Sequence, residues 1–162
     1  MYGRVGRLGP RATAALLALG GFVAVVLVPG LKYPANPPSV GNPETIGLRT
    51  QLFFVMLLIS VAALVLAAVL ARRLSARYGT WNATLIAGAV FVVVIGIVQY
   101  ALPEINEVPE QFSAVVLWRF RLASLGIQVV LWTTIGLLFG ALTERSFPSG
   151  FSRPLSVRAA SR

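Results

Sequence analysis

The sequence contains no cysteine and no histidine. Without cysteine it can form no disulfide framework and no thiolate metal site, and without histidine it lacks the commonest metal ligand in proteins. The same absences exclude a Ser-His-Asp triad and a Cys-His pair. The apolar stretches also hold neither paired acids nor a glycine-rich phosphate loop. We therefore expect no enzymatic activity and no permanently bound cofactor.

Charged residues are also scarce. They make up 12% of the chain, whereas 57% of the residues are hydrophobic and the mean hydropathy is +0.81; an ordinary soluble domain carries about 25% charged residues. Four stretches lack any charged side chain and reach the roughly 20 residues that cross the hydrocarbon core of a bilayer. They are residues 12–30, 51–71, 82–102 and 122–142. This pattern predicts an all-α polytopic membrane protein with a bundle of four transmembrane helices.

The basic residues are distributed unequally between the two sides of this bundle. One side receives ten arginines, namely Arg4, Arg7, Arg11, Arg72, Arg73, Arg77, Arg145, Arg153, Arg158 and Arg162. The other side receives Lys32, Arg49, Arg119 and Arg121, together with four of the five glutamates. By the positive-inside rule, both termini are predicted to be cytoplasmic. A cleaved signal peptide is the alternative for the first span, and its length disfavours this reading. The net charge of +9 is explained by this placement and does not indicate nucleic-acid binding.

The chain is therefore divided into three parts. Residues 1–11 form a basic cytoplasmic N-terminus, 12–142 the membrane domain with outer loops 31–50 and 103–121, and 143–162 a basic, disordered cytoplasmic tail. When the chain is shifted so that Arg49 matches Arg121, Arg73 matches Arg145, which is consistent with two tandem helical hairpins. Chance resemblance between apolar helices explains the same match, and the two readings stay open.

The first outer loop contains KYPANPPSVGNPETIGLRT, whose prolines fix the backbone and prevent a helix. Such a loop is stiff, and it either orders an entrance to the bundle or simply connects two helices. The residues proposed to form an entrance or gate are Lys32, Tyr33, Asn36, Glu44, Arg49, Arg119 and Arg121. The alternative for the arginines is ion pairing with the loop glutamates or contact with lipid phosphates.

The second outer loop carries three carboxylates, Glu104, Glu107 and Glu110. They create a negative potential that would concentrate cations, and their oxygens could contact a divalent metal. A solvated acidic loop is the alternative.

Polar residues within the predicted spans are few. The candidates for a polar path across the membrane are Gln99, Gln128, Thr133 and Thr134. Hydrogen bonds between helices explain such residues equally well. Gly136 and Gly140 form a G-x-x-x-G pair, for which simple packing of the bundle is the preferred interpretation.

Several long motifs carry a resemblance to a known family. They are KYPANPPSVGNPETIGLRT, NEVPEQF, LWRFRLASLG, YGRVGRLGPRATAALLALGGFV, ARRLSARYGTWNATL and GALTER. On these motifs the sequence resembles the CbtA family of predicted cobalt transporter subunits. The resemblance implies a bacterial inner-membrane protein linked to cobalt uptake for cobalamin synthesis, often beside a small histidine-bearing subunit, CbtB. It also implies about two further spans with an acidic, often histidine-bearing loop ahead of Met1, so we expect this sequence to be an N-terminally short form.

These observations together predict an integral membrane subunit of a cobalt or similar divalent-cation uptake transporter, with cobalt(II) as the transported ion. The alternative is a non-transporting scaffold that stabilises another membrane subunit. The expected partners are the lipid bilayer and a CbtB-like subunit.

Overall fold

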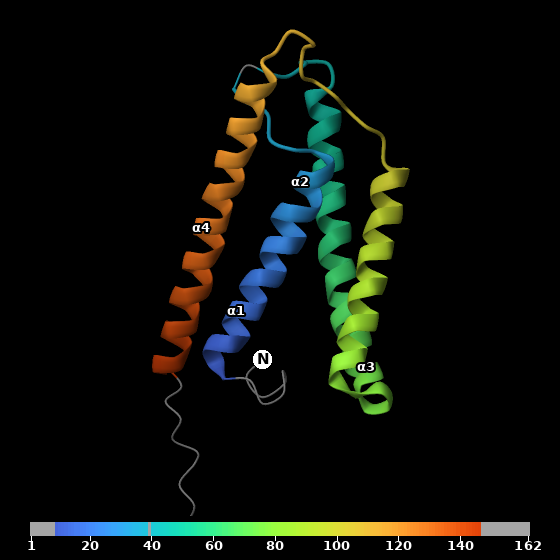
Figure 1. Ribbon diagram of the computed structural model, residues 1–162, viewed down its shortest axis with the longest axis vertical. Helices are drawn as coiled ribbons and strands as arrows, with labels where there is room; N and C mark the ends of the chain where they lie inside the picture. The colour runs from blue at the N-terminus through green and yellow to red at the C-terminus, as the bar shows by residue number, and fades with distance from the viewer. Residues whose placement is uncertain (1–8, 39, 147–162) are drawn as a thin grey trace, which may run out of the picture.

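The computed structural model describes residues 9–38 and 40–146, and this part of the chain consists of helices and connecting loops, without strands. The elements are α1 (Pro10–Gly21), the π-helix η1 (Phe22–Leu27), α2 (Val28–Lys32), α3 (Ile46–Ala101) and α4 (Ala114–Ser146). Figure 1 shows them as long rods joined by loops at one end. The predicted all-α membrane fold is confirmed at this level, while the N-terminal eight residues, Ser39 and the tail from 147 to 162 lie outside the described residues.

The first rod runs through α1, η1 and α2, from Pro10 to Lys32, and is long and apolar enough to cross a membrane. Its hydrogen bonding changes from the α-helical to the π-helical pattern at η1. The cause is Pro29, which has no amide hydrogen and whose ring clashes with the preceding α-helical turn. In the π-helical turn before it, the Val28 amide donates to the Val23 carbonyl, five residues back. In this register the partner of the Ala24 carbonyl would be Pro29, which cannot donate. The hydroxyl of Ser60 in α3 donates to that carbonyl instead.

The longest element, α3, reverses direction at Gly79. This residue has φ 76° and ψ 160°, which glycine adopts without a steric penalty. It divides α3 into arms 46–78 and 80–101, which lie side by side in Figure 1. The predicted spans 51–71 and 82–102 lie almost entirely within one arm each. The described residues therefore contain three helices of spanning length and apolarity, not the four predicted, and the fourth is not shown as a separate helix.

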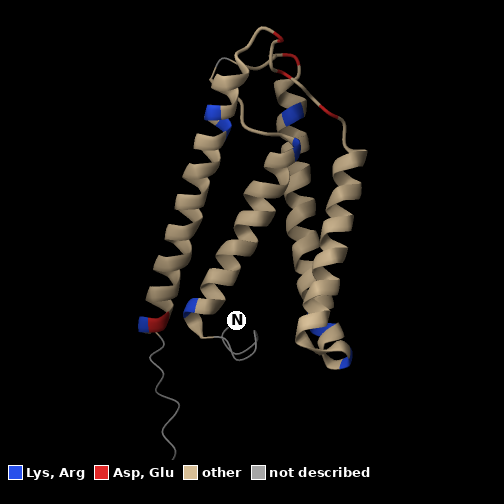
Figure 2. Cartoon of the chain, viewed as in Figure 1, with Lys and Arg blue, Asp and Glu red and all other residues tan. Residues whose placement is uncertain are grey.

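The loops are shorter than predicted. The predicted outer loops were 31–50 and 103–121, but α3 begins at Ile46 and α4 at Ala114. The bounds differ because the sequence analysis located where charged residues begin, whereas a helix needs only continuous backbone hydrogen bonds and can extend beyond the hydrocarbon. As a result Arg49 and Arg121 project from helices. Figure 2 shows acidic residues gathered in the loops at one end and basic residues near both ends.

Two packing zones hold the rods together. In the first, small residues let α1 approach α4: an added Cβ on Gly136 would lie 2.8 Å from the Cβ of Ala18, and one on Gly140 would lie 3.4 Å from that of Ala14. The ion pair Arg11–Glu144, at 2.5 Å, lies at the end of this seam far from the loops. The G-x-x-x-G pair thus packs within the chain, as the sequence analysis preferred.

In the second zone, α2 packs on α3. The buried residues are Val28, Tyr33, Met56 and Ile95, and they come from α2, the following loop and both arms of α3. Among the described elements, α4 packs mainly on α1 and α3 mainly on η1 and α2, with no extensive interface between α3 and α4. The first rod therefore joins the two halves of the molecule.

A small-residue exchange tests the α1–α4 seam. Gly136→Ala is expected to lower the free energy of unfolding by about 1–3 kcal/mol, because the new methyl group would overlap Ala18. The matched control is Gly126→Ala, on the same helix, where an added Cβ meets nothing within 4 Å. It should be neutral or stabilising by up to about 1 kcal/mol, since alanine favours helix. Thermal unfolding of the purified protein, followed by tryptophan fluorescence, measures both.

The double variant Ala18→Gly with Gly136→Ala should recover most of the loss, because it restores the original number of methyl groups at the contact. Equal stability of Gly136→Ala and Gly126→Ala would contradict the tight packing of this seam.

Candidate functional site

The two loops, residues 33–45 and 102–113, meet at one end of the bundle (Figure 1). They contain Tyr33, Asn36 and Glu44 of the residues proposed for an entrance, whereas Lys32, Arg49, Arg119 and Arg121 lie on the adjoining helices. The first loop has turns but no regular helix, as its prolines predict. Its carbonyls therefore lack the repeating partners of a helix and need other donors.

Glu107 is the most enclosed charge in this region. Its side chain is only 1% exposed. One carboxylate oxygen accepts a hydrogen bond of 2.9 Å from the hydroxyl of Thr45, and the other lies 3.7 Å from Nε of Arg49. The guanidinium of Arg49 also donates to the carbonyl of Pro34. Glu107 and Arg49 thus connect the second loop to α3 and to the first loop, residues 33–45, which we call the proline-rich loop.

Arg121 makes the equivalent connection from α4. Its Nε and one terminal nitrogen each lie 3.3 Å from an acceptor, the Ala35 carbonyl and the Asn36 side-chain oxygen respectively. Adjacent carbonyls of the proline-rich loop, those of Pro34 and Ala35, are therefore held by arginines from two different helices. This explains why the loop keeps a fixed course without secondary structure.

Two further contacts join the loops. The hydroxyl of Tyr33 donates to the carbonyl of Pro103 at 2.9 Å. Burial raises the pKa of Tyr33 above its usual value, so the side chain stays a neutral donor at physiological pH. Lys32 lies 3.6 Å from Glu104, whose side chain is 91% exposed. The Lys32 side chain is only 10% exposed, but the pair contributes little stability because its carboxylate is open to water and salt.

The structure does not bring the three loop glutamates together. Glu104 faces Lys32, Glu107 is enclosed by Arg49 and Thr45, and Glu110 is exposed. Among the residues with described positions, no group of three or more acidic side chains could hold a metal ion. The metal-contact role of Glu104, Glu107 and Glu110 stays a prediction.

The other entrance candidates lie at the surface. Glu44 is exposed and its backbone amide donates to the side chain of Asn42 at 3.0 Å. Arg119 is exposed as well. Ion pairing with a loop glutamate was one alternative predicted for the outer arginines. Arg49 forms such a pair with Glu107.

The candidates for a polar path lie in different surroundings. The Gln99 amide donates to the Val28 carbonyl at 3.0 Å, which ties the second arm of α3 to α2. Thr134 donates to Val130 within its own helix at 2.8 Å. Thr133 and Gln128 line two separate cavities. The proposed path stays a prediction, and the observed bonds of Gln99 and Thr134 are structural.

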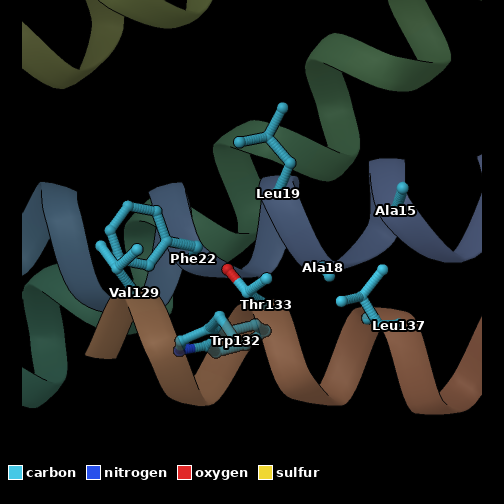
Figure 3. Close-up of a pocket in the computed structure, with 9 residues that line it drawn as sticks. Ala15, Ala18, Leu19, Phe22, Val129, Trp132, Thr133 and Leu137 are labelled. Carbon is cyan, nitrogen blue, oxygen red and sulfur yellow. The ribbon is translucent and has the colours of Figure 1, made fainter. Parts of the chain in front are cut away.

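The Thr133 cavity lies between α4 and the first rod and has a volume of about 320 Å³. In Figure 3, Leu19 and Phe22 come from the first rod and Trp132 and Leu137 from α4. The only polar groups among the side chains that line it are the Thr133 hydroxyl and the indole N–H of Trp132. This cavity is therefore unsuited to a hydrated ion.

Sequence reasoning missed two residues of structural importance. Thr45 supports the carboxylate of Glu107, and no sequence pattern links positions so far apart. Ser60 donates to Ala24, and here a signal exists: Pro29 follows Ala24 by five residues, so a π-helical turn leaves that carbonyl without a backbone donor.

Loss of the Glu107 charge is expected to weaken the loop assembly. Glu107→Gln should lower the free energy of unfolding by about 3 kcal/mol, because it leaves the largely buried guanidinium of Arg49 without its counter-ion. Glu110→Gln is the matched control, since Glu110 is exposed on the same loop, and it should change stability by less than about 0.5 kcal/mol. Thermal unfolding at neutral pH measures both variants. Equal effects would contradict a structural role for the Glu107–Arg49 pair.

A family model described as "Probable cobalt transporter subunit (CbtA)" matches residues 1–144. No curated protein and no solved structure gives a significant match. The family match covers both loops and every described helix except the last two residues of α4, and the long apolar helices fit a membrane protein. The chain therefore belongs to the CbtA family of probable cobalt transporter subunits.

Proposed function

We propose that this protein is an integral subunit of a cobalt(II) uptake transporter in the bacterial inner membrane, where it supplies cobalamin synthesis. The observation that carries the proposal is the family match over residues 1–144. The helices of spanning length support a location in the membrane. The chain acts with other subunits and carries no permanent cofactor or enzymatic activity.

The proposed arrangement in the membrane has four crossings, with both termini in the cytoplasm. The reversal at Gly79 supports this count, because it splits α3 into two antiparallel arms. A straight helix of 56 residues would be about 84 Å long, nearly three times the hydrocarbon thickness. Arg72, Arg73 and Arg77 precede the reversal and mark that end as cytoplasmic. The two loops then face outward.

At the outer surface the exposed glutamates Glu104 and Glu110 attract hydrated cations by their negative potential. Glu107 has a different duty, because its charge is already used to hold Arg49. The proline-rich loop, fixed by Arg49 and Arg121, provides a rigid rim for the entrance.

Selectivity for cobalt requires ligands that this chain does not offer. It has no histidine and no cysteine, and oxygen ligands alone discriminate poorly among transition metals. We therefore include a small histidine-bearing, CbtB-like subunit in the proposed transporter.

A non-transporting scaffold is the second candidate. It is favoured by one observation: the buried Ser60 and the half-buried Gln99 donate hydrogen bonds to the backbone of the first rod. Such bonds stabilise the bundle of this chain and leave neither side chain free to line a path.

The proposed orientation is tested by single cysteines, which is straightforward because the natural chain has none. Glu44→Cys should react with a membrane-impermeant maleimide in spheroplasts, since residue 44 is exposed on the outward loop. Thr80→Cys, exposed beside Gly79, should react only after the membrane is permeabilised. The same labelling behaviour for both variants in spheroplasts would contradict the proposed orientation.

Transport is tested with radiolabelled cobalt in cells expressing this chain alone and with a histidine-bearing partner. Uptake is expected with the partner present. The double variant Glu104→Gln/Glu110→Gln should lower initial uptake severalfold at low ionic strength and less at high salt, because electrostatic attraction is screened. Glu144→Gln, at the opposite end of the bundle, is the control. Membrane abundance is measured in parallel.

Cobalt uptake in neither case, with normal abundance of the protein, would favour the scaffold over the transporter.

A further inference from the structure

The largest of the cavities described lies between α4 and the first arm of α3. Its volume is about 710 Å³, and residues of η1, α2 and the proline-rich loop form its remaining wall. It exists because α3 and α4 make no extensive interface with each other in the described part of the chain. This cavity, which we call the α3–α4 groove, is separate from the cavity in Figure 3.

The polarity of the groove changes along its length. Arg49 and Arg121 line it at the end nearest the loops. Ser124 and Gln128 follow on α4 at a helical spacing of three and seven residues from Arg121, so they continue along the same face. Beyond them, Leu131 and Ile135 continue this wall with apolar side chains. The groove is thus cationic at one end, neutral and polar next, and apolar beyond.

The charge at the cationic end is incompletely balanced. Arg49 has Glu107 at 3.7 Å. Arg121 is half-buried, and its bonds to Ala35 and Asn36 reach only neutral oxygens. None of the ion pairs found among residues 9–38 and 40–146 includes Arg121. A guanidinium has five N–H donors, so several remain available for another acceptor. A partly buried charge of this kind is stabilised by an anion.

We propose that the α3–α4 groove binds one anionic phospholipid. The phosphate contacts Arg121 and the neighbouring Arg49, and the ester groups lie beside Ser124 and Gln128. An acyl chain follows the apolar wall toward Leu131 and Ile135. Each part of the lipid then meets a surface of matching polarity, with charge-assisted bonds at the phosphate. This proposal rests on the groove and its charges, and it does not depend on cobalt transport.

The charge of Arg121 argues for a lipid over a transmembrane helix of a partner as the occupant. A spanning helix consists of about 20 mainly apolar residues, in which an acidic side chain is costly and rare. An anionic phospholipid carries a negative phosphate at one end and acyl chains at the other, which is the order of polarity along the groove. Lipid is also in constant contact with the surface of a membrane protein.

Native mass spectrometry of the purified full-length protein tests the proposal. The detergent-solubilised chain is titrated with phosphatidylglycerol and, separately, with phosphatidylcholine carrying the same acyl chains. We expect one phosphatidylglycerol to be retained preferentially. Arg121→Gln should weaken its binding about tenfold or more, as expected for loss of one charged contact. The matched control, Arg119→Gln, removes an exposed charge on the same helix that does not line the groove, and it should bind as the natural chain does.

Because Arg121 also holds the proline-rich loop, thermal unfolding of each variant is measured without lipid. Arg121→Lys keeps the charge and should bind phosphatidylglycerol more tightly than Arg121→Gln even if both are destabilised. Equal retention of the two lipids by the natural chain would overturn the proposal, as would equal losses in the Arg121→Gln and Arg119→Gln variants.

Displacement of the lipid by millimolar inorganic phosphate would indicate a simple anion site. Displacement by a co-expressed membrane subunit would indicate a partner's carboxylate as the occupant. Either result would also overturn it.

Discussion

The structure depends on one requirement: each backbone carbonyl that a helix cannot use must find another donor, because the hydrocarbon provides no water. Most of the chain meets it by forming long helices. Pro29 creates an exception within the first rod, and the Ser60 hydroxyl supplies the bond that Pro29 cannot make to Ala24. Gln99 donates to Val28 from the other arm of α3. The irregular turn is therefore also the point at which the first rod is joined to α3.

The same requirement operates in the proline-rich loop, where arginines are the donors. Arg49 and Arg121 bond to the carbonyls of Pro34 and Ala35 from two helices that have no extensive contact with each other. The loop thus bridges the two halves of the bundle at one end, while the seam of small residues joins α1 to α4 along their length. Glu107 supports this arrangement because it balances the charge of Arg49 in a nearly closed environment.

This arrangement separates two kinds of charge at the loop end. Glu107 and Arg49 are enclosed and hold the loops, whereas Glu104 and Glu110 are open to solvent and can act on ions in solution. Arg121 belongs partly to each kind. It holds the loop through neutral oxygens and keeps a charge that faces the α3–α4 groove. In the proposed transporter, cations collect above the rim formed by the loops and an anionic lipid occupies the groove beside it.

The sequence alone determined the helical membrane class, the location of the apolar segments and the irregular course of the proline-rich loop. These features follow from local chemistry: apolar length, the cost of burying charge and the geometry of proline. It did not determine where the chain reverses between the second and third apolar segments, since the reversal needs only Gly79 in an unusual conformation. Nor could it identify which glutamate is enclosed, because Glu104, Glu107 and Glu110 look alike until Thr45 and Arg49 are brought beside one of them. Only the tertiary structure decides such pairings, because burial and hydrogen bonding depend on residues far apart in the chain.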